Sequence, residues 1–176
     1  MKNTYKMVLA ALFLSLGLVL PSLTLRIPEI GRMLLPMHIP VLICGFVCGY
    51  KYGLLVGFIT PLLHSIRFQM PPLLPDAVSM AFELATYGLL VGLLYKLLKG
   101  KKLRIYFSLL PAMIAGRIVW GIVRVIIAGV SKYTFSYAAF IGGALLNAIP
   151  GIILQIVLIP TIILTLEKSG VLKIDD

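Results

Sequence analysis

Charged side chains interrupt long apolar runs of this sequence at three positions. Glu83 lies within the run from residue 77 to 95, and Arg117 and Arg124 lie within the run from residue 105 to 131. A charge at membrane depth is costly, so residues of this kind are typical of functional sites. Guanidinium groups bind carboxylates through paired hydrogen bonds. These positions predict a binding site for a small molecule that carries a negative charge.

The spacing of these residues predicts a shared helical face. Arg117, Trp120 and Arg124 are three and four residues apart, so they lie on one side of a helix. Glu83 can neutralise one of the two arginines, and we expect Asp76 to lie at the surface. The pattern therefore predicts surplus positive charge inside the protein, next to an indole that can hold a flat or aliphatic group.

Further side chains are expected in the same layer, and each has a structural alternative. The additional substrate-binding candidates are Tyr87, His64, Arg67 and Asn147. Glu83 and Arg117 could instead form a structural ion pair. Arg67 and Arg124 could reach lipid headgroups, His64 could contact a loop or headgroup, and Asn147 could bond a neighbouring helix.

Composition identifies the elements that must position these residues. The chain is 60% hydrophobic and 12% charged, with a mean hydropathy of +1.06, which excludes an ordinary soluble domain. We predict an all-α polytopic membrane protein in which residues 1–176 form one domain. A secretory signal is the alternative for the first apolar run. The six predicted transmembrane helices are residues 5–25, 37–50, 52–69, 76–98, 104–130 and 137–167.

The basic residues are distributed unequally between the two sides of the predicted membrane spans. In a soluble protein, the net charge of +10 would instead suggest binding to nucleic acid. The outer loops carry four of them, at Arg26, Arg32, Arg67 and Lys132. The inner segments carry ten, at Lys2, Lys6, Lys51, Lys96, Lys99, Lys101, Lys102, Arg104, Lys168 and Lys173. Positive residues favour the cytoplasmic side. We therefore expect both termini in the cytoplasm, contact with membrane lipid, and no nucleic-acid partner.

Small residues recur at helical spacing in the middle spans. Gly45, Gly49, Gly53 and Gly57 are four residues apart and predict a tight helical hairpin that turns at residues 50–52. The fourth span continues the pattern at Ala81, Ala85, Gly88 and Gly92. We interpret these residues as packing surfaces.

Several catalytic motifs are missing. The sequence has no phosphate-binding loop, HExxH or GxSxG motif, and we expect no catalytic residue, cofactor or metal ion. Six spans are also few for a transporter built from paired repeats. A capture subunit driven by other proteins fits best, and the alternatives are an oligomeric channel or facilitator and a structural membrane subunit.

Two segments carry a resemblance to a known family. LLPMHIPVLICGFVCGYKYG (34–53) and FELATYGLLVGLLY (82–95) resemble the S component, the substrate-binding subunit of energy-coupling factor (ECF) transporters, which import vitamins into bacteria. The resemblance implies an S-component-like bundle in the bacterial plasma membrane, with a transmembrane coupling subunit and two ATPase subunits as partners.

The resemblance also implies roles for particular residues. Helices four, five and six would contact the vitamin from the extracellular side, where Glu83, Arg117, Arg124 and Asn147 match. A small-xxx-small motif on the first helix, here Ala11 and Ser15, would contact the coupling subunit. Pantothenate is the first substrate candidate, and riboflavin, folate, nicotinate and pyridoxal-type compounds remain alternatives.

Overall fold

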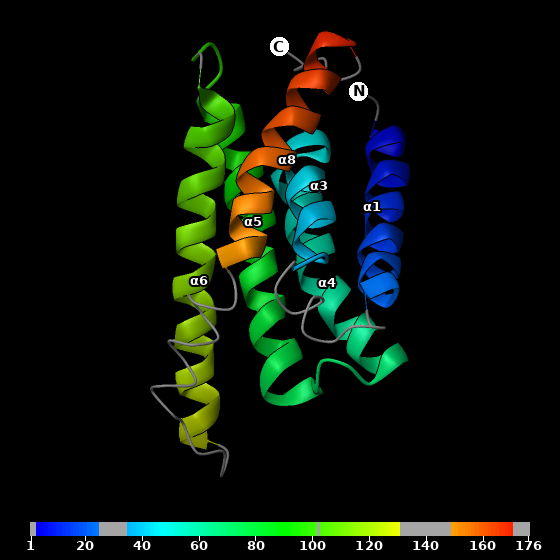
Figure 1. Cartoon of the computed structure of the whole chain (residues 1–176), viewed down its shortest axis with the longest axis vertical. Coiled ribbons are helices and arrows are strands. Elements are labelled where there is room, and N and C mark those ends of the chain that lie inside the picture. The colour runs from blue at the N-terminus through cyan, green and yellow to red at the C-terminus, as the bar shows by residue number, and fades with distance from the viewer. Residues whose placement is uncertain (1–2, 25–34, 102, 131–148, 171–176) are drawn as a thin grey trace.

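The computed structural model describes residues 3–24, 35–101, 103–130 and 149–170. These residues form six α-helices and one short π-helical turn, η1, and contain no strand (Figure 1). This confirms the predicted all-α bundle. In chain order the elements are α1 (Asn3–Thr24), α3 (His38–Cys48), α4 (Tyr50–Phe68), η1 (Leu73–Ala77), α5 (Val78–Leu97), α6 (Arg104–Val130) and α8 (Ile149–Lys168).

Four segments of the described chain are long and apolar enough to cross a membrane. They are Asn3–Pro21, Leu73–Leu97, Arg104–Val130 and Ile149–Lys168. The predicted span 104–130 coincides with α6, whereas α8 covers the later part of the predicted span 137–167 and residues 137–148 lie outside the described residues. The remaining helices are α4, with 19 residues, and α3, with 11.

The short helix α3 forms the centre of the bundle. Its eleven residues span about 16 Å at 1.5 Å per residue, which is less than the hydrocarbon thickness. Ten of them are buried, because α1, α4, α5 and α8 pack around it. A helix that is apolar on every side is stable in such a position. His38, the first residue of α3, is thereby placed inside the protein.

The predicted hairpin exists, but its turn lies earlier than residues 50–52. The turn is at Gly49, which has φ +92° and separates α3 from α4. Glycine adopts a positive φ without the steric penalty that a Cβ atom imposes. Residues 50–52 therefore form the first turn of α4, and the chain bends before them.

The packing role of the small residues is confirmed at the contact of α5 with α3 and α4. Gly45 and Gly53 meet the backbone at Gly88, and Gly57 meets the backbone at Leu84. A Cβ atom on Gly88 would collide with the backbone of Gly53. These backbones approach because no side chain separates them, so α5 is held in one position against its neighbours.

The two ends of the bundle differ in charge. The start of α1 and the end of α8 lie at one end, together with the Cys48–Tyr50 turn and the connection from α5 to α6 (Figure 1). The lysines of the described residues lie in or next to the segments at this end. They are Lys6, Lys51, Lys96, Lys99, Lys101 and Lys168. The η1 turn, which contains Asp76, and the last part of α6, which contains Arg124, lie toward the opposite end. Which end faces the cytoplasm stays a prediction from the positive-inside rule.

Candidate functional site

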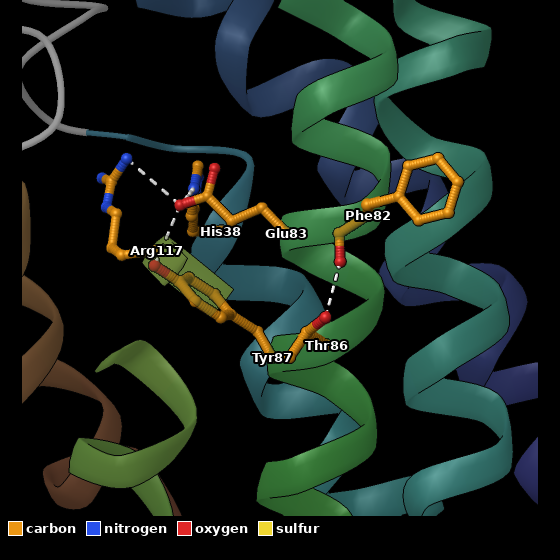
Figure 2. A network of polar contacts seen from close by, with 6 residues as sticks. All are labelled: His38, Phe82, Glu83, Thr86, Tyr87 and Arg117. Carbon is orange, nitrogen blue, oxygen red and sulfur yellow. Dashed lines mark hydrogen bonds and ion pairs between the residues drawn. The ribbon is translucent and has the colours of Figure 1, made fainter. Parts of the chain in front are cut away.

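Glu83 is the centre of a buried polar cluster. Its side chain is 1% exposed, and its Oε1 atom lies 3.1 Å from Nη1 of Arg117. The same oxygen accepts a hydrogen bond of 3.0 Å from the Tyr87 hydroxyl and lies 3.7 Å from Nε2 of His38. Figure 2 shows these side chains converging from α3, α5 and α6. We call His38, Glu83, Tyr87 and Arg117 the Glu83 cluster.

Local helix geometry explains why the cluster assembles. Glu83 and Tyr87 are one turn apart on α5, so their side chains lie on the same face. The Tyr87 ring lies against Gly116 of α6, at a position that a Cβ atom would occupy. The missing side chain of Gly116 lets α6 approach α5 at this level. Arg117, the next residue, is thereby brought within reach of the carboxylate.

Arg117 uses one part of its guanidinium and leaves another unpaired. Nη1 faces Glu83, whereas Nε and Nη2 are buried and have no hydrogen-bond partner among the described residues. Nε and Nη2 lie on the same edge of the planar group, and their two N–H bonds point the same way. This edge is the fork that binds a carboxylate bidentately. A buried donor without a partner costs about 1–3 kcal/mol, so such an edge is typical of a binding site.

The predicted face of α6 is confirmed around Trp120. The Cζ atoms of Arg117 and Arg124 lie 6.0 Å and 5.0 Å from the centre of its ring. Both distances allow cation–π attraction. The indole is 8% exposed. It therefore joins the two arginines in one continuous polar and aromatic face.

The predicted surplus of positive charge is wrong. Asp76, expected at the surface, forms an ion pair with Arg124, and the two side chains are 32% and 29% exposed. The η1 turn causes this pairing, because it packs against α6 and brings Asp76 to the helix. Each arginine of this face therefore has a carboxylate partner. Recognition of an anion here must therefore depend on the orientation of N–H donors that have no partner among the described residues.

His38 was not predicted from the sequence as a site residue. Its side chain is 1% exposed, its ring centre lies 5.5 Å from that of Tyr87, and neither ring nitrogen has a hydrogen-bond partner among the described residues. The sequence did indicate it, because His38 is a polar residue at the start of an apolar run, and Glu83 is a polar residue within another. The rule that selected Glu83 as a polar residue at membrane depth would have selected His38 as well.

The structure does not bring every predicted residue into this cluster. His64 is buried near the end of α4, and its Nδ1 atom contacts the Met70 carbonyl oxygen at 2.5 Å. Arg67 is exposed, with its guanidinium 5.8 Å from the Phe68 ring. Asn147 lies outside the described residues. Within the described ranges, no group of three or more histidine, cysteine or acidic residues could hold a metal ion.

The fold and this cluster define a class: an all-α membrane protein that buries a small set of charged side chains between three helices. The chain belongs to the family of substrate-specific components of ECF transporters, because the model of that family matches residues 5–163. No curated protein and no solved structure matches the sequence of this chain significantly.

Family membership establishes the general role of the chain. It is a substrate-binding subunit of an ECF transporter and a multi-pass protein of the plasma membrane, and not an enzyme. The family also implies association with an ECF module of coupling and ATPase subunits. The match specifies no substrate.

Proposed function

We propose that this subunit captures a small vitamin that carries a carboxylate, and that the carboxylate binds the Nε and Nη2 edge of Arg117. The observation that carries this proposal is that both atoms are buried and unpaired among the described residues, while Nη1 is held by Glu83. A carboxylate satisfies both donors at once, which a single hydroxyl or carbonyl cannot do with the same geometry. Pantothenate is the first candidate, since it combines a carboxylate with an aliphatic chain.

The neighbouring residues have distinct roles in this proposal. Glu83 and Tyr87 fix the orientation of Arg117 through the shared oxygen Oε1. Trp120 supplies an apolar surface for the remainder of the vitamin, and the Arg124 guanidinium lies 5.0 Å from the centre of its ring. Asn147, from the last span, remains a candidate contact by resemblance. His64 and Arg67, which lie away from the Glu83 cluster, have no role in it.

The charge of the two bundle ends supports a direction of uptake. The lysine-rich end belongs in the cytoplasm by the positive-inside rule, which places Asp76 and Arg124 toward the exterior. Arg117 is the middle residue of the 27-residue α6, about 20 Å from either end at 1.5 Å per residue, so the Arg124 end of the site lies outward of it. We therefore propose entry from the extracellular side and delivery to the cytoplasm by the ECF module.

A panel of vitamins tests the proposed function. We expect pantothenate to raise the melting temperature of the purified, detergent-solubilised chain without ATP, because a ligand at 100 times its Kd adds about 2.7 kcal/mol of stability. Pantothenol, in which an alcohol replaces the carboxylate, is the matched control and is expected to have little effect. Nicotinate, folate, riboflavin and pyridoxal complete the panel. A melting temperature that no member of the panel changes would contradict the proposal.

We also propose that Ala11 and Ser15 contact the coupling subunit. Both are exposed on α1, and the Ser15 hydroxyl bonds the Ala11 carbonyl oxygen at 3.0 Å, so neither side chain prevents a close approach of another helix. We expect Ala11→Trp to abolish copurification with the coupling subunit while pantothenate binding is retained. Ile114→Trp, at a position on α6 that is 64% exposed, is the control. Equal copurification of both variants would rule out this contact.

A further inference from the structure

The His38 imidazole is a buried titratable group to which the proposed function gives no role. Its Nε2 atom is 3.7 Å from Oε1 of Glu83, which is too long for a hydrogen bond but short enough for an ion pair if the ring is protonated. The ring is 1% exposed, and both nitrogens are without hydrogen-bond partners among the described residues. Both nitrogens carry a proton only in the imidazolium form.

The charges around the cluster balance when His38 is neutral. Glu83 pairs with Arg117, and Asp76 pairs with Arg124. The two pairs are joined by Trp120, which lies close to both guanidiniums. A carboxylate ligand is ionised near neutral pH and adds one negative charge to this balanced group. An uncompensated charge in a buried site is strongly unfavourable, so a compensating positive charge favours binding.

His38 is positioned to supply that charge. From α5 it faces Glu83 and Tyr87, and from α6 Arg117 reaches the same carboxylate oxygen. No described side chain of α4 or α8 forms a hydrogen bond with a ring nitrogen of His38. The ring is at the N-terminal residue of α3, where the helix dipole disfavours a cation. A second anion near Arg117 offsets this effect.

We propose that His38 takes up one proton from solvent when the anionic substrate binds. This inference rests on the proposed function and concerns the same site. The substrate carboxylate adds one negative charge, the imidazolium adds one positive charge, and the total returns to zero. Because protons and substrate then bind together, the affinity for substrate falls as pH rises. Uptake of one proton per substrate corresponds to a rise of Kd by up to about tenfold per pH unit.

Isothermal titration calorimetry measures the proton directly. Pantothenate is titrated into the full, detergent-solubilised chain at pH 7.5 in buffers of different ionisation enthalpy, and nicotinate and folate serve as further probes. We expect close to one proton taken up per ligand bound by the natural protein. We expect close to none for His38→Gln, which keeps a polar side chain that does not titrate. The chain has two histidines, and His64→Gln is expected to keep the full proton uptake.

A second measurement uses only the natural protein, so it does not require that a substituted chain folds. Nitrogen NMR of the ¹⁵N-histidine-labelled chain distinguishes neutral from protonated imidazole at each of the two histidines. Pantothenate is expected to convert one ring to the imidazolium at pH 7.5.

The outcomes separate this inference from the proposed function. Binding with no proton uptake overturns the inference and leaves the proposed function intact. Uptake that persists in His38→Gln also overturns it, because the proton then resides on Glu83 or on the ligand. If none of the three carboxylates binds, both proposals fail.

Discussion

Arg117→Lys is expected to weaken pantothenate binding by roughly 30- to 150-fold. Lysine keeps the positive charge and can still pair with Glu83, but it lacks the planar fork formed by Nε and Nη2 of Arg117. One charge-assisted hydrogen bond and its geometry are lost, which corresponds to about 2–3 kcal/mol. The measurement is Kd by calorimetry on the detergent-solubilised protein. The melting temperature is measured alongside, and it should change little.

Arg104→Lys is the matched control for this variant. Arg104 pairs with Glu167 at 2.8 Å, and its side chain is 17% exposed, close to the 18% of Arg117. It is about 20 Å from Arg117 along the same helix. The same chemical change is therefore made in a similar ion pair away from the Glu83 cluster, and Kd should stay the same. Equal Kd values for Arg117→Lys and the natural protein would show that the free edge of Arg117 binds no substrate.

Glu83→Gln is expected to lower the free energy of unfolding by about 3 kcal/mol. The substitution leaves Arg117 without its carboxylate partner, and removing one member of a buried pair typically costs 3–5 kcal/mol. The lower figure applies because the arginine side chain is 18% exposed. A double variant, Glu83→Gln with Arg117→Met, should recover part of the loss, since it also removes the unpaired charge.

Unfolding of these variants is followed by helical circular dichroism in detergent micelles at increasing denaturant. Glu167→Gln is the comparison, because its carboxylate is 21% exposed and also faces an arginine. Its loss should be about 1 kcal/mol, because this carboxylate is partly accessible to water whereas that of Glu83 is 1% exposed. If the double variant is no more stable than Glu83→Gln alone, the destabilisation does not arise from the unpaired guanidinium.

Much of the fold was predictable because it depends on local chemistry. The length of an apolar run decides whether a helix can cross the membrane, and the predicted span 104–130 has the bounds of α6. Glycine spacing predicted close helix contacts, and the backbones of α4 and α5 meet at Gly53 and Gly88. The exact position of the turn was not predictable from spacing, because Gly45, Gly49 and Gly53 are all compatible with a bend and only Gly49 adopts a positive φ.

The candidate site was predictable to the extent that its residues share a helix. Arg117, Trp120 and Arg124 were predicted to form one face because helical periodicity relates them, and the two cation–π distances confirm that face. Glu83 was selected because its charge interrupts an apolar run. Both inferences require no knowledge of how one helix faces another.

The sequence by itself determined that this is a helical membrane protein, where its charged residues enter apolar helices, and which of them share a helix face. The tertiary structure decided the partners between elements. It placed His38 and Arg117 at the same oxygen of Glu83, and it placed Asp76 beside Arg124. The physical reason is that periodicity constrains residues within one helix, whereas the rotation of neighbouring helices depends on contacts such as Gly116 with Tyr87 and on the η1 turn.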